Sequence, residues 1–425
     1  MKFYTSVNRF GNQILVRGYK DGLRFTDKVQ YSPTLFVPDE KGTWTGLDGT
    51  KVSPIKLDSM REAREFLNRY NDVEGFTIYG NQNYVAQYVT EAFPGQIEFD
   101  RTKVNVCTID IEVASDNGFP FPEKAEQELI SITCKNNIDD TYYVWGLYDY
   151  DVSKSVIQDS RVVYYKCDSE SRLLLDFINW WSSPRNTPDV VTGWNTKMFD
   201  MVYIINRIKN TIGEEFVKKL SPWGKVDLRP IKMLNKEVQA YDVMGIQQLD
   251  YLDLFRKFGY KYGAQESYKL DHIAHVVLGE NKLSYEEYGN LFTLYKEDFQ
   301  KFIDYNIKDV ELVTALDKKK RLIESYGVKA FKSHGLDEQG WAMYRAVGCG
   351  ECGGTGYKGR MAIHEMLPCS SKLREMIYRR ASLDEIRKQA VVEGMRTMRQ
   401  DGIQKIIAGH SDYSQLLQVV GVAVD

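Results

Sequence analysis

An apolar strand near residue 110 carries two acidic side chains, and this pattern limits the possible folds more than any other in the chain. The segment Val106–Val113 reads VCTIDIEV, with Asp110 and Glu112 two residues apart. Alternate side chains of a β-strand share a face, so both carboxylates point the same way. Burying two like charges side by side is costly unless a cation offsets their repulsion. The pattern therefore indicates either an exposed sheet edge or a site for a divalent metal ion.

Composition excludes several classes of protein. The chain has 425 residues, of which 43% are hydrophobic and 27% charged, as in a folded globular protein of more than one domain. A formal net charge of −3 argues against a protein that binds duplex DNA over its whole surface, but it does not exclude local DNA-binding grooves. The sequence has no signal peptide and no apolar run long enough to span a membrane. We therefore expect a cytoplasmic protein.

The order of strand and helix patterns predicts three domains with boundaries near residues 100 and 322. Residues 1–100 hold short alternating segments broken by Gly, Asp and Pro, which predicts a small β-rich domain with one helix near 60–70. In residues 101–322 strands alternate with helices, which is typical of an α/β layer fold. Residues 323–425 are rich in Gly, Cys and Met and then show helical periodicity, so we expect a mainly helical segment there.

Particular elements of the α/β segment follow from the same patterns. Strands are expected at 103–113, 128–134 and 189–193, and helices at 173–181, from about 200, and at 299–316. The basic run KKKR at 318–321 is most simply the solvated end of the last helix.

Two further acidic positions lie on the expected helices. Asp200 stands at the start of a helix with an apolar face, where a cap that complements the helix dipole would also explain it. Tyr305 and Asp309 are four residues apart and therefore share one helix face. Each motif is weak by itself, because such residues usually only cap, pack or pair.

Taken in order, the motifs DxE, NxxxFD and YxxxD resemble those of the 3′–5′ proofreading exonuclease domain of family B DNA polymerases, most closely those of T-even-like bacteriophages. The resemblance covers residues 1–322 and extends through GFP at 118–120, TGWN at 192–195, LDYLDL at 249–254 and YNIKDV at 305–310. It implies a ribonuclease H-like fold and removal of nucleotides from single-stranded or frayed DNA 3′-ends. It also implies the cytoplasm of an infected bacterial host as the location.

The resemblance assigns roles to individual residues. Two divalent ions, Mg²⁺ or Mn²⁺, would lie about 3.5–4 Å apart, one generating hydroxide from water and the other stabilising the leaving 3′-oxygen. The ligands would be four carboxylates: Asp110, Glu112, Asp200 and Asp309. Tyr305 would orient the attacking water, and Lys282 would steady negative charge near the scissile phosphate. A solvated surface lysine is the alternative explanation of Lys282.

Contacts with DNA are implied for three residues of the matching motifs. Phe119 could stack on a base, with core packing as the plainer alternative. Asn195 and Phe199 are the other two candidates. The alternating segment 226–242 resembles a protruding hairpin that helps to separate primer from template in the family.

Other acids are expected to lie outside the metal site. Asp250 and Asp253 pair in sequence but do not match the family's ligands. Asp304 falls on a different helix face from Asp309.

The polymerase motifs of the family, DxxSLYP and YxDTD, do not occur in the sequence. We therefore expect no nucleotide incorporation by this polypeptide alone. A DNA 3′-end or primer–template is the implied partner, together with a separate palm-bearing polymerase chain and a replication clamp as further candidates. A non-catalytic DNA-binding or regulatory fragment is the alternative function.

Residues 323–425 resemble the C-terminal end of type II secretion and type IV pilus assembly ATPases, through 344–360, IHE at 363–365 and 394–402. In that family two CxxC pairs bind zinc, so Cys349 and Cys352 are half of such a site. His364 and Cys369 give a finger-like spacing but are not ligands in the family, so closed zinc coordination is not favoured. The other Cys residues are scattered singly, as expected for reduced thiols.

The resemblance of the tail raises two further functions, ATP hydrolysis and an adaptor role. The sequence has no GxxxxGK[ST] motif, so ATP hydrolysis is not expected. An adaptor to a secretion machine is a further alternative function, carried by the tail.

Overall fold

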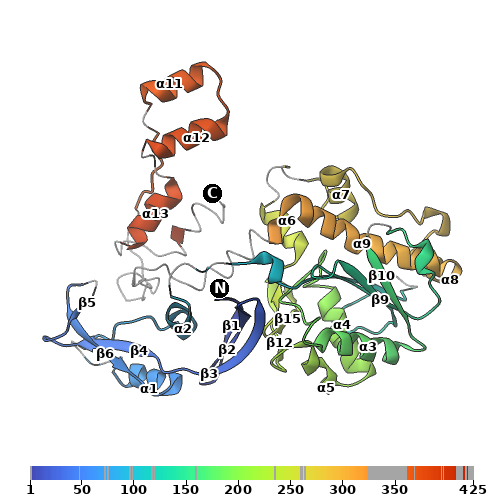
Figure 1. Cartoon of the computed structure of the whole chain (residues 1–425), viewed down its shortest axis with the longest axis horizontal. Coiled ribbons are helices and arrows are strands. Elements are labelled where there is room, and N and C mark those ends of the chain that lie inside the picture. The colour runs from blue at the N-terminus through green and yellow to red at the C-terminus, as the bar shows by residue number, and fades with distance from the viewer. Residues whose placement is uncertain are drawn as a thin grey trace. The chain divides into compact units, whose positions relative to one another are not determined.

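The computed structural model describes residues 2–46, 48–70, 73, 76–94, 97, 99–115, 118, 120–157, 160–233, 236–258, 262, 265–323, 361–367, 369–393, 395, 397–407, 415–416 and 419 (Figure 1). The chain forms two compact units. The first comprises Met1–Thr34, Lys56–Arg69 and Asn83–Glu338, and the second comprises Leu35–Ile55, Tyr70–Gln82 and Gln339–Asp425.

A six-stranded mixed sheet forms the centre of the first unit, in the order β10-β9-β8-β7-β11-β16. Its strands are β7 Val106–Val113, β8 Leu129–Asn136, β9 Thr141–Gly146, β10 Arg161–Lys166, β11 Val190–Thr192 and β16 Gln247–Gln248. β8 runs antiparallel to β7 and β9, and the remaining neighbours are parallel. This sheet confirms the predicted α/β class and is consistent with a ribonuclease H-like fold.

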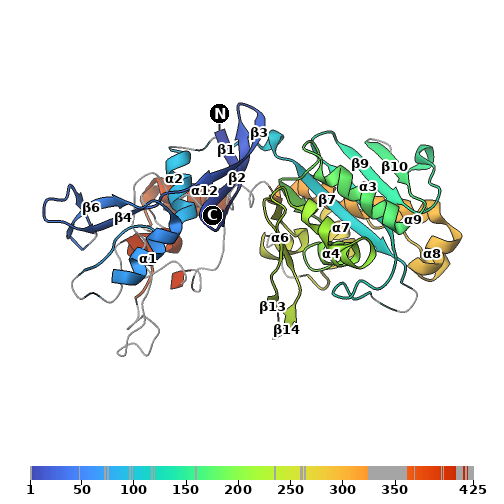
Figure 2. The same ribbon diagram turned by 90° about the horizontal axis from the view of Figure 1, so that it is seen from below.

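Helices cover both faces of this sheet (Figures 1 and 2). α3 Glu170–Ser182 and α4 Asp200–Thr211 pack over the face that carries Ile109 and Ile111. α9 Phe299–Lys320 packs against β7 and β8 on the other face. Since side chains alternate along a strand, Asp110 and Glu112 must point toward α9.

The long helix α9 positions one end of the functional site. Its N-cap Asp298 accepts a hydrogen bond from the Lys301 backbone at 2.9 Å. The helix ends at Lys320, and its C-cap Arg321 adopts a left-handed conformation with φ 53°. The basic run thus forms the end of the helix, as expected from the sequence, and its cations complement the negative end of the helix dipole.

The remaining described helices and the hairpin of the first unit lie around this core. They are α5 Glu214–Val217, α6 Tyr251–Phe258, α7 Leu270–Leu278, α8 Leu291–Glu297, and the antiparallel pairs β12 Val226–Leu228 with β15 Tyr241–Val243 and β13 Ile231–Met233 with β14 Lys236–Val238. Figure 2 shows β13 and β14 extending away from the sheet, as expected for the hairpin at 226–242.

The N-terminal residues of the first unit form an antiparallel sheet, β1 Lys2–Phe10, β2 Gln13–Lys20 and β3 Leu23–Gln30. The expected helix is α1 Met60–Tyr70, but a second helix, α2 Tyr84–Ala92, also forms. The prediction of a single helix before residue 100 was therefore wrong. α2 is only nine residues long, and its cap is Asn83, whose side chain accepts from the Ala86 backbone. A helix this short shows too few turns for a clear period.

The second unit contains the sheet β4-β6-β5, formed by Thr34–Pro38, Lys51–Lys56 and Trp44–Thr45, and the helices of the tail. The tail helices are α11 Ser371–Tyr378, α12 Leu383–Val392 and α13 Met398–Ile407. A small core of Leu373, Met376 and Ala390 joins α11 to α12. The mainly helical character predicted for the tail is confirmed. In the described part of the chain, every helix is too short or too polar to cross a membrane.

A buried ion network ties the β1–β3 sheet to the central sheet. Asp189 is fully buried; its Oδ2 accepts from the Tyr19 hydroxyl at 2.7 Å and from Arg24 at 3.0 Å. The Arg17 guanidinium lies 3.6 Å from Asp189 Oδ1 and donates to the carbonyls of Thr187 and Pro188. Burial lowers the pKa of Arg17, and the charge of Asp189 opposes this shift. The charged forms of Arg17 and Asp189 therefore stabilise each other in the buried network.

We expect Asp189→Ala to destabilise the first unit by about 3–5 kcal/mol, because it leaves Arg17 buried without a counter-ion. Urea unfolding measures this loss. The control is Glu65→Ala, which removes the exposed pair with Arg61 at 2.8 Å and should cost less than about 0.5 kcal/mol. Equal losses in the two variants would contradict a structural role for the network.

Candidate metal centre

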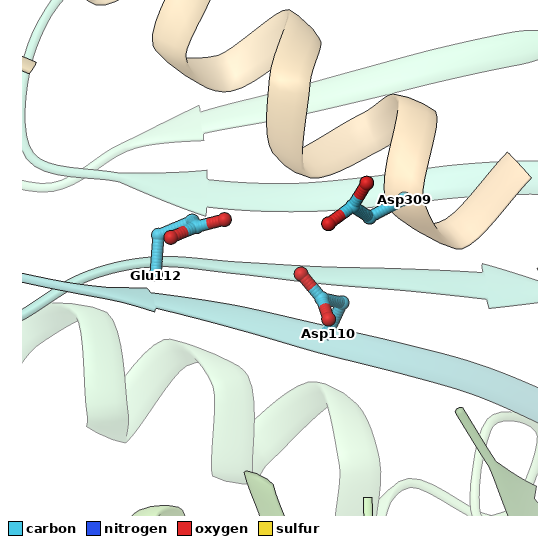
Figure 3. A group of neighbouring side chains, drawn as sticks. All are labelled: Asp110, Glu112 and Asp309. Atoms are coloured by element: carbon cyan, nitrogen blue, oxygen red, sulfur yellow. The ribbon is translucent and has the colours of Figure 1, made fainter. Parts of the chain in front are cut away.

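Three carboxylates meet between β7 and α9. One carboxylate oxygen each from Asp110, Glu112 and Asp309 lies within 4.8 Å of the other two. Figure 3 shows the three side chains turned toward one another, two from the strand and one from the helix above it. The strand period places Asp110 and Glu112 on one face, and the packing of α9 brings Asp309 to them.

Asp200, the fourth expected ligand, lies beside this three-carboxylate cluster but is not a member of it. It is the first residue of α4 and is almost fully buried. Its Oδ1 accepts a hydrogen bond from the backbone nitrogen of Ile111 at 3.2 Å. The side chain thus reaches the β7 backbone between the two strand acids, and its charge contributes to raising the pKa of Asp110.

Burial and mutual repulsion raise the pKa values of Asp110, Glu112 and Asp200 and so favour their neutral forms. Burial, with a contribution from Asp309, raises the pKa of Glu112 to about 8. Burial also raises the pKa of Asp200 to about 8. The pKa of Asp110 is raised well above its usual value by burial and by the charges of Asp200, Asp309 and Glu112. A bound cation would favour the ionised forms by opposing both effects.

The chemistry of the cluster fits a divalent cation. Asp309 Oδ1 is buried and has no hydrogen-bond partner among the described residues. An unpaired buried carboxylate oxygen is costly, and this oxygen therefore fits the role of a ligand to a cation. Carboxylate oxygens are hard ligands, which suit Mg²⁺ and Mn²⁺ better than softer metals.

Lys282 and Tyr305 border the cluster on the α9 side. The Lys282 ammonium donates to the Tyr305 hydroxyl at 2.9 Å and contacts Asp309 Oδ2. Burial lowers the pKa of Lys282, but Asp309 and Tyr305 together more than offset this effect, so that the pKa is raised. Its backbone nitrogen donates to Asp271 Oδ1 at 2.8 Å, which anchors the loop. This side chain is 25% exposed and paired, which differs from a solvated surface lysine.

Sequence reasoning missed three polar residues next to the cluster: Asn306 on α9, and Ser131 and Thr133 on β8. Asn306 Nδ2 donates to Asp110 Oδ2 at 2.6 Å. In the sheet register Thr133 lies opposite Asp110, and Ser131 lies opposite Glu112. The signal was present in the sequence, because these two hydroxyl residues alternate with apolar residues in the stretch Leu129–Cys134.

The three candidates for DNA contact have different surroundings. Phe119 lies outside the described residues. Asn195 adopts a left-handed conformation with φ 68° in the turn after β11. Phe199 is partly buried against the core under α4, with its ring centroid 5.8 Å from that of Tyr203. Core packing therefore explains most of the position of the Phe199 side chain.

Two acids expected outside the metal site have structural partners. Asp250 accepts hydrogen bonds from the backbone nitrogens of Asn195 and Lys197 at 3.1 and 3.0 Å, and so holds the turn after β11. Asp304 accepts from the Tyr150 hydroxyl at 2.7 Å. Neither belongs to the three-carboxylate cluster.

The candidate zinc ligands of the tail are not brought together in the described residues. Cys349 and Cys352 lie outside them. Cys369 is a free, exposed thiol. The backbone nitrogen of His364 donates to Asp401 Oδ2 at 2.9 Å, and its ring lies 3.8 Å from the same carboxylate.

Comparison with known proteins finds two families along the chain. Residues 82–273 match the exonuclease domain of DNA polymerase family B, and residues 302–418 match the type II/IV secretion system proteins. The DNA-directed DNA polymerase of Enterobacteria phage T4 is 34% identical over 345 residues, and that of Escherichia phage RB69 is 33% identical over 348. Each alignment covers 76% of this chain and 38% of the polymerase. Both resemblances seen in the sequence are thereby confirmed.

The tail has relatives of its own. The type IV pilus assembly ATPase PilB of Thermus thermophilus is 43% identical over 86 residues, which are 20% of this chain and 10% of that ATPase. The chain therefore spans less than half of the polymerases and a small part of the ATPase. The secretion-family match begins inside α9, the helix that carries Asp309 and packs against β7 and β8.

We expect the metal-free protein to lose stability as the pH rises from about 5 to about 8. The pKa of Glu112 is about 8 in the folded chain against an ordinary 4.5. Between these values the unfolded chain has released a proton that the folded chain keeps, so stability falls with rising pH. Thermal unfolding in chelator should show a smaller fall for Glu112→Gln, by a few degrees at about 2–4 °C per kcal/mol.

The same experiment has a second arm. Added Mn²⁺ should raise the melting temperature more at about pH 8 than at about pH 5, because the cation binds ionised carboxylates. Identical pH profiles for the wild type and Glu112→Gln would contradict the electrostatics described for the cluster.

Proposed function

We propose that this chain is a metal-dependent 3′–5′ exonuclease, because residues 82–273 match the exonuclease domain of DNA polymerase family B. Its proposed substrate is the 3′-end of single-stranded or frayed DNA, in the cytoplasm of an infected bacterium. The observation that carries the proposal is the cluster of Asp110, Glu112 and Asp309 between β7 and α9, on the motifs that match the family.

The proposed ligands of two Mg²⁺ or Mn²⁺ ions are the three clustered carboxylates and Asp200. When bound, such ions supply an activated water and stabilise the leaving 3′-oxygen. Asp309 would use Oδ1, since its Oδ2 contacts Lys282. Asp200 keeps Oδ2 for this role, because Oδ1 accepts from the Ile111 backbone.

Tyr305 and Lys282 are proposed to act on the water and the phosphate. The Tyr305 hydroxyl accepts from the Lys282 ammonium, so its own proton stays available to orient a water molecule beside the cluster. The Lys282 charge lies within the same group of side chains and would stabilise the negative charge that develops on the phosphate.

The proposed source of 3′-ends is a primer–template, presented with a separate palm-bearing polymerase chain and a replication clamp. The T4 relative is a DNA-directed DNA polymerase, of which this chain covers 38%. Asn195 and Phe119 remain proposed DNA contacts. A protein that bound such DNA without cutting it would instead be a regulatory fragment.

The nuclease is proposed to end near residue 323. The Ile323 backbone nitrogen donates to Asp317 Oδ1 at 2.9 Å, and Arg101 donates to Asp317 Oδ2 at 3.1 Å. These contacts tie the end of α9 to the residues that precede β7. The tail beyond them is proposed to contribute neither to the cleavage site nor to ATP hydrolysis.

The central test is a nuclease assay with a 3′-recessed mismatched primer and Mg²⁺ or Mn²⁺. We expect shortening from the 3′-end. Asp110→Ala combined with Glu112→Ala should lower the rate by at least about 10³-fold, because several kcal/mol of transition-state stabilisation are lost. The matched control is Asp304→Asn, an acid on α9 outside the cluster, which should keep near wild-type activity.

A second variant tests the proposed boundary. A chain that ends at Ile323 should fold and keep the nuclease activity of the whole chain within about twofold, because the contacts of the cluster lie before this residue. Zinc analysis of the whole chain checks the tail separately. Loss of activity on truncation, with the fold intact by circular dichroism, would show that the tail takes part in the reaction.

A further inference from the structure

Asn306 lies at the centre of a buried hydrogen-bond network that joins α9 to β8 and β7. Its side chain is fully buried. The amide oxygen accepts from the Ser131 hydroxyl at 3.0 Å and from the Thr133 hydroxyl at 2.5 Å. The amide nitrogen donates to Asp110 Oδ2 at 2.6 Å. Both hydroxyl residues are also fully buried, so water does not compete for these bonds.

The two hydroxyls bind the amide oxygen of Asn306, so that its NH₂ group faces Asp110. An amide has one end that accepts and one end that only donates. The accepting end of Asn306 is already occupied by two donors, which leaves the NH₂ group for the carboxylate. If the amide were rotated by a half-turn, its oxygen would face Asp110 Oδ2, and in the ionised form of Asp110 that binds a metal two acceptors would oppose each other. The strand β8 therefore orients the amide.

The oriented amide restricts Asp110. Asn306 donates to Oδ2 of Asp110, and Oδ1 accepts no hydrogen bond from the described residues. Asp309 is held in a similar way, since Lys282 contacts Oδ2 and Oδ1 has no partner among the described residues. In both acids the protein occupies one oxygen and leaves the other for a ligand. Side chains held in this way lose less freedom when a metal binds.

We propose that Asn306, oriented by Ser131 and Thr133, is a positioning residue that holds Asp110 in its metal-binding orientation. The inference rests on the proposed function of the cluster as a metal site. It assigns to β8, which carries no ligand itself, the task of orienting a ligand of β7 through a residue of α9.

A purely structural role is the competing explanation, because the same bonds also fasten α9 to the sheet. Tyr150→Phe is a matched control for it. That variant removes the hydrogen bond from Tyr150 to Asp304 at 2.7 Å, which fastens the same helix two residues away and does not reach the cluster. If Asn306 served only to anchor the helix, Asn306→Ala and Tyr150→Phe would change metal binding alike.

The test measures Mn²⁺ binding to the whole chain by calorimetry or electron paramagnetic resonance, without substrate. We expect Asn306→Ala to raise the Kd by about 10–100-fold, as is typical for the loss of a residue that orients a ligand. Ser131→Ala with Thr133→Val should raise Kd in the same direction while keeping the volume of Asn306. The triple variant should bind no more weakly than Asn306→Ala, since all three residues act through one amide. Tyr150→Phe should leave Kd unchanged.

The outcomes separate this inference from the proposed function. Absence of Mn²⁺ binding by the wild type would overturn the metal site itself, and the inference with it. Binding by the wild type with an unchanged Kd for folded Asn306→Ala, or for the Ser131 and Thr133 double variant, would overturn the inference alone. An equal rise of Kd in Tyr150→Phe, or fully additive effects in the triple variant, would also overturn it.

Discussion

The site depends on one electrostatic constraint, the enclosure of several carboxylates between a strand and a helix. Asp110 and Glu112 would repel each other and Asp309 if all were ionised, and burial raises the pKa values of both strand acids. A fold that only needed stability would place apolar side chains on this face of β7. The opposite face of the same strand does carry apolar residues, Ile109 and Ile111. The placement of the acids is therefore the one that the proposed cation site requires.

The surrounding structure supports these acids by occupying selected oxygens. Lys282 contacts Asp309, Asn306 donates to Asp110, and the Ile111 backbone donates to Asp200. A buried carboxylate with one oxygen engaged keeps a defined direction for the other. Asp189 is likewise a buried carboxylate whose oxygens are engaged by neighbouring side chains, at the place where the N-terminal sheet joins the central one. There every partner comes from the protein, which makes that network structural.

The join between the two families runs through α9. The secretion-family match begins at residue 302, yet α9 packs against β7 and β8 and carries Asp309. Packing therefore assigns this helix to the unit that holds the three-carboxylate cluster. The contacts of Asp317 with Arg101 and Ile323 fasten the end of α9 to the residues that precede β7. The tail helices have a small core of their own around Leu373 and Ala390.

Local sequence alone determined the elements and the direction of several side chains. The period of a strand placed Asp110 and Glu112 on one face, and the period of a helix placed Tyr305 and Asp309 together. The short helix α2 was not predicted, because its nine residues give only a weak helical period. Tertiary structure alone decided that Asp200 reaches the β7 backbone and that Ser131 and Thr133 orient Asn306. The partners in those contacts depend on strand order and register, which are set by pairing between distant segments and cannot be read from a local period in the sequence.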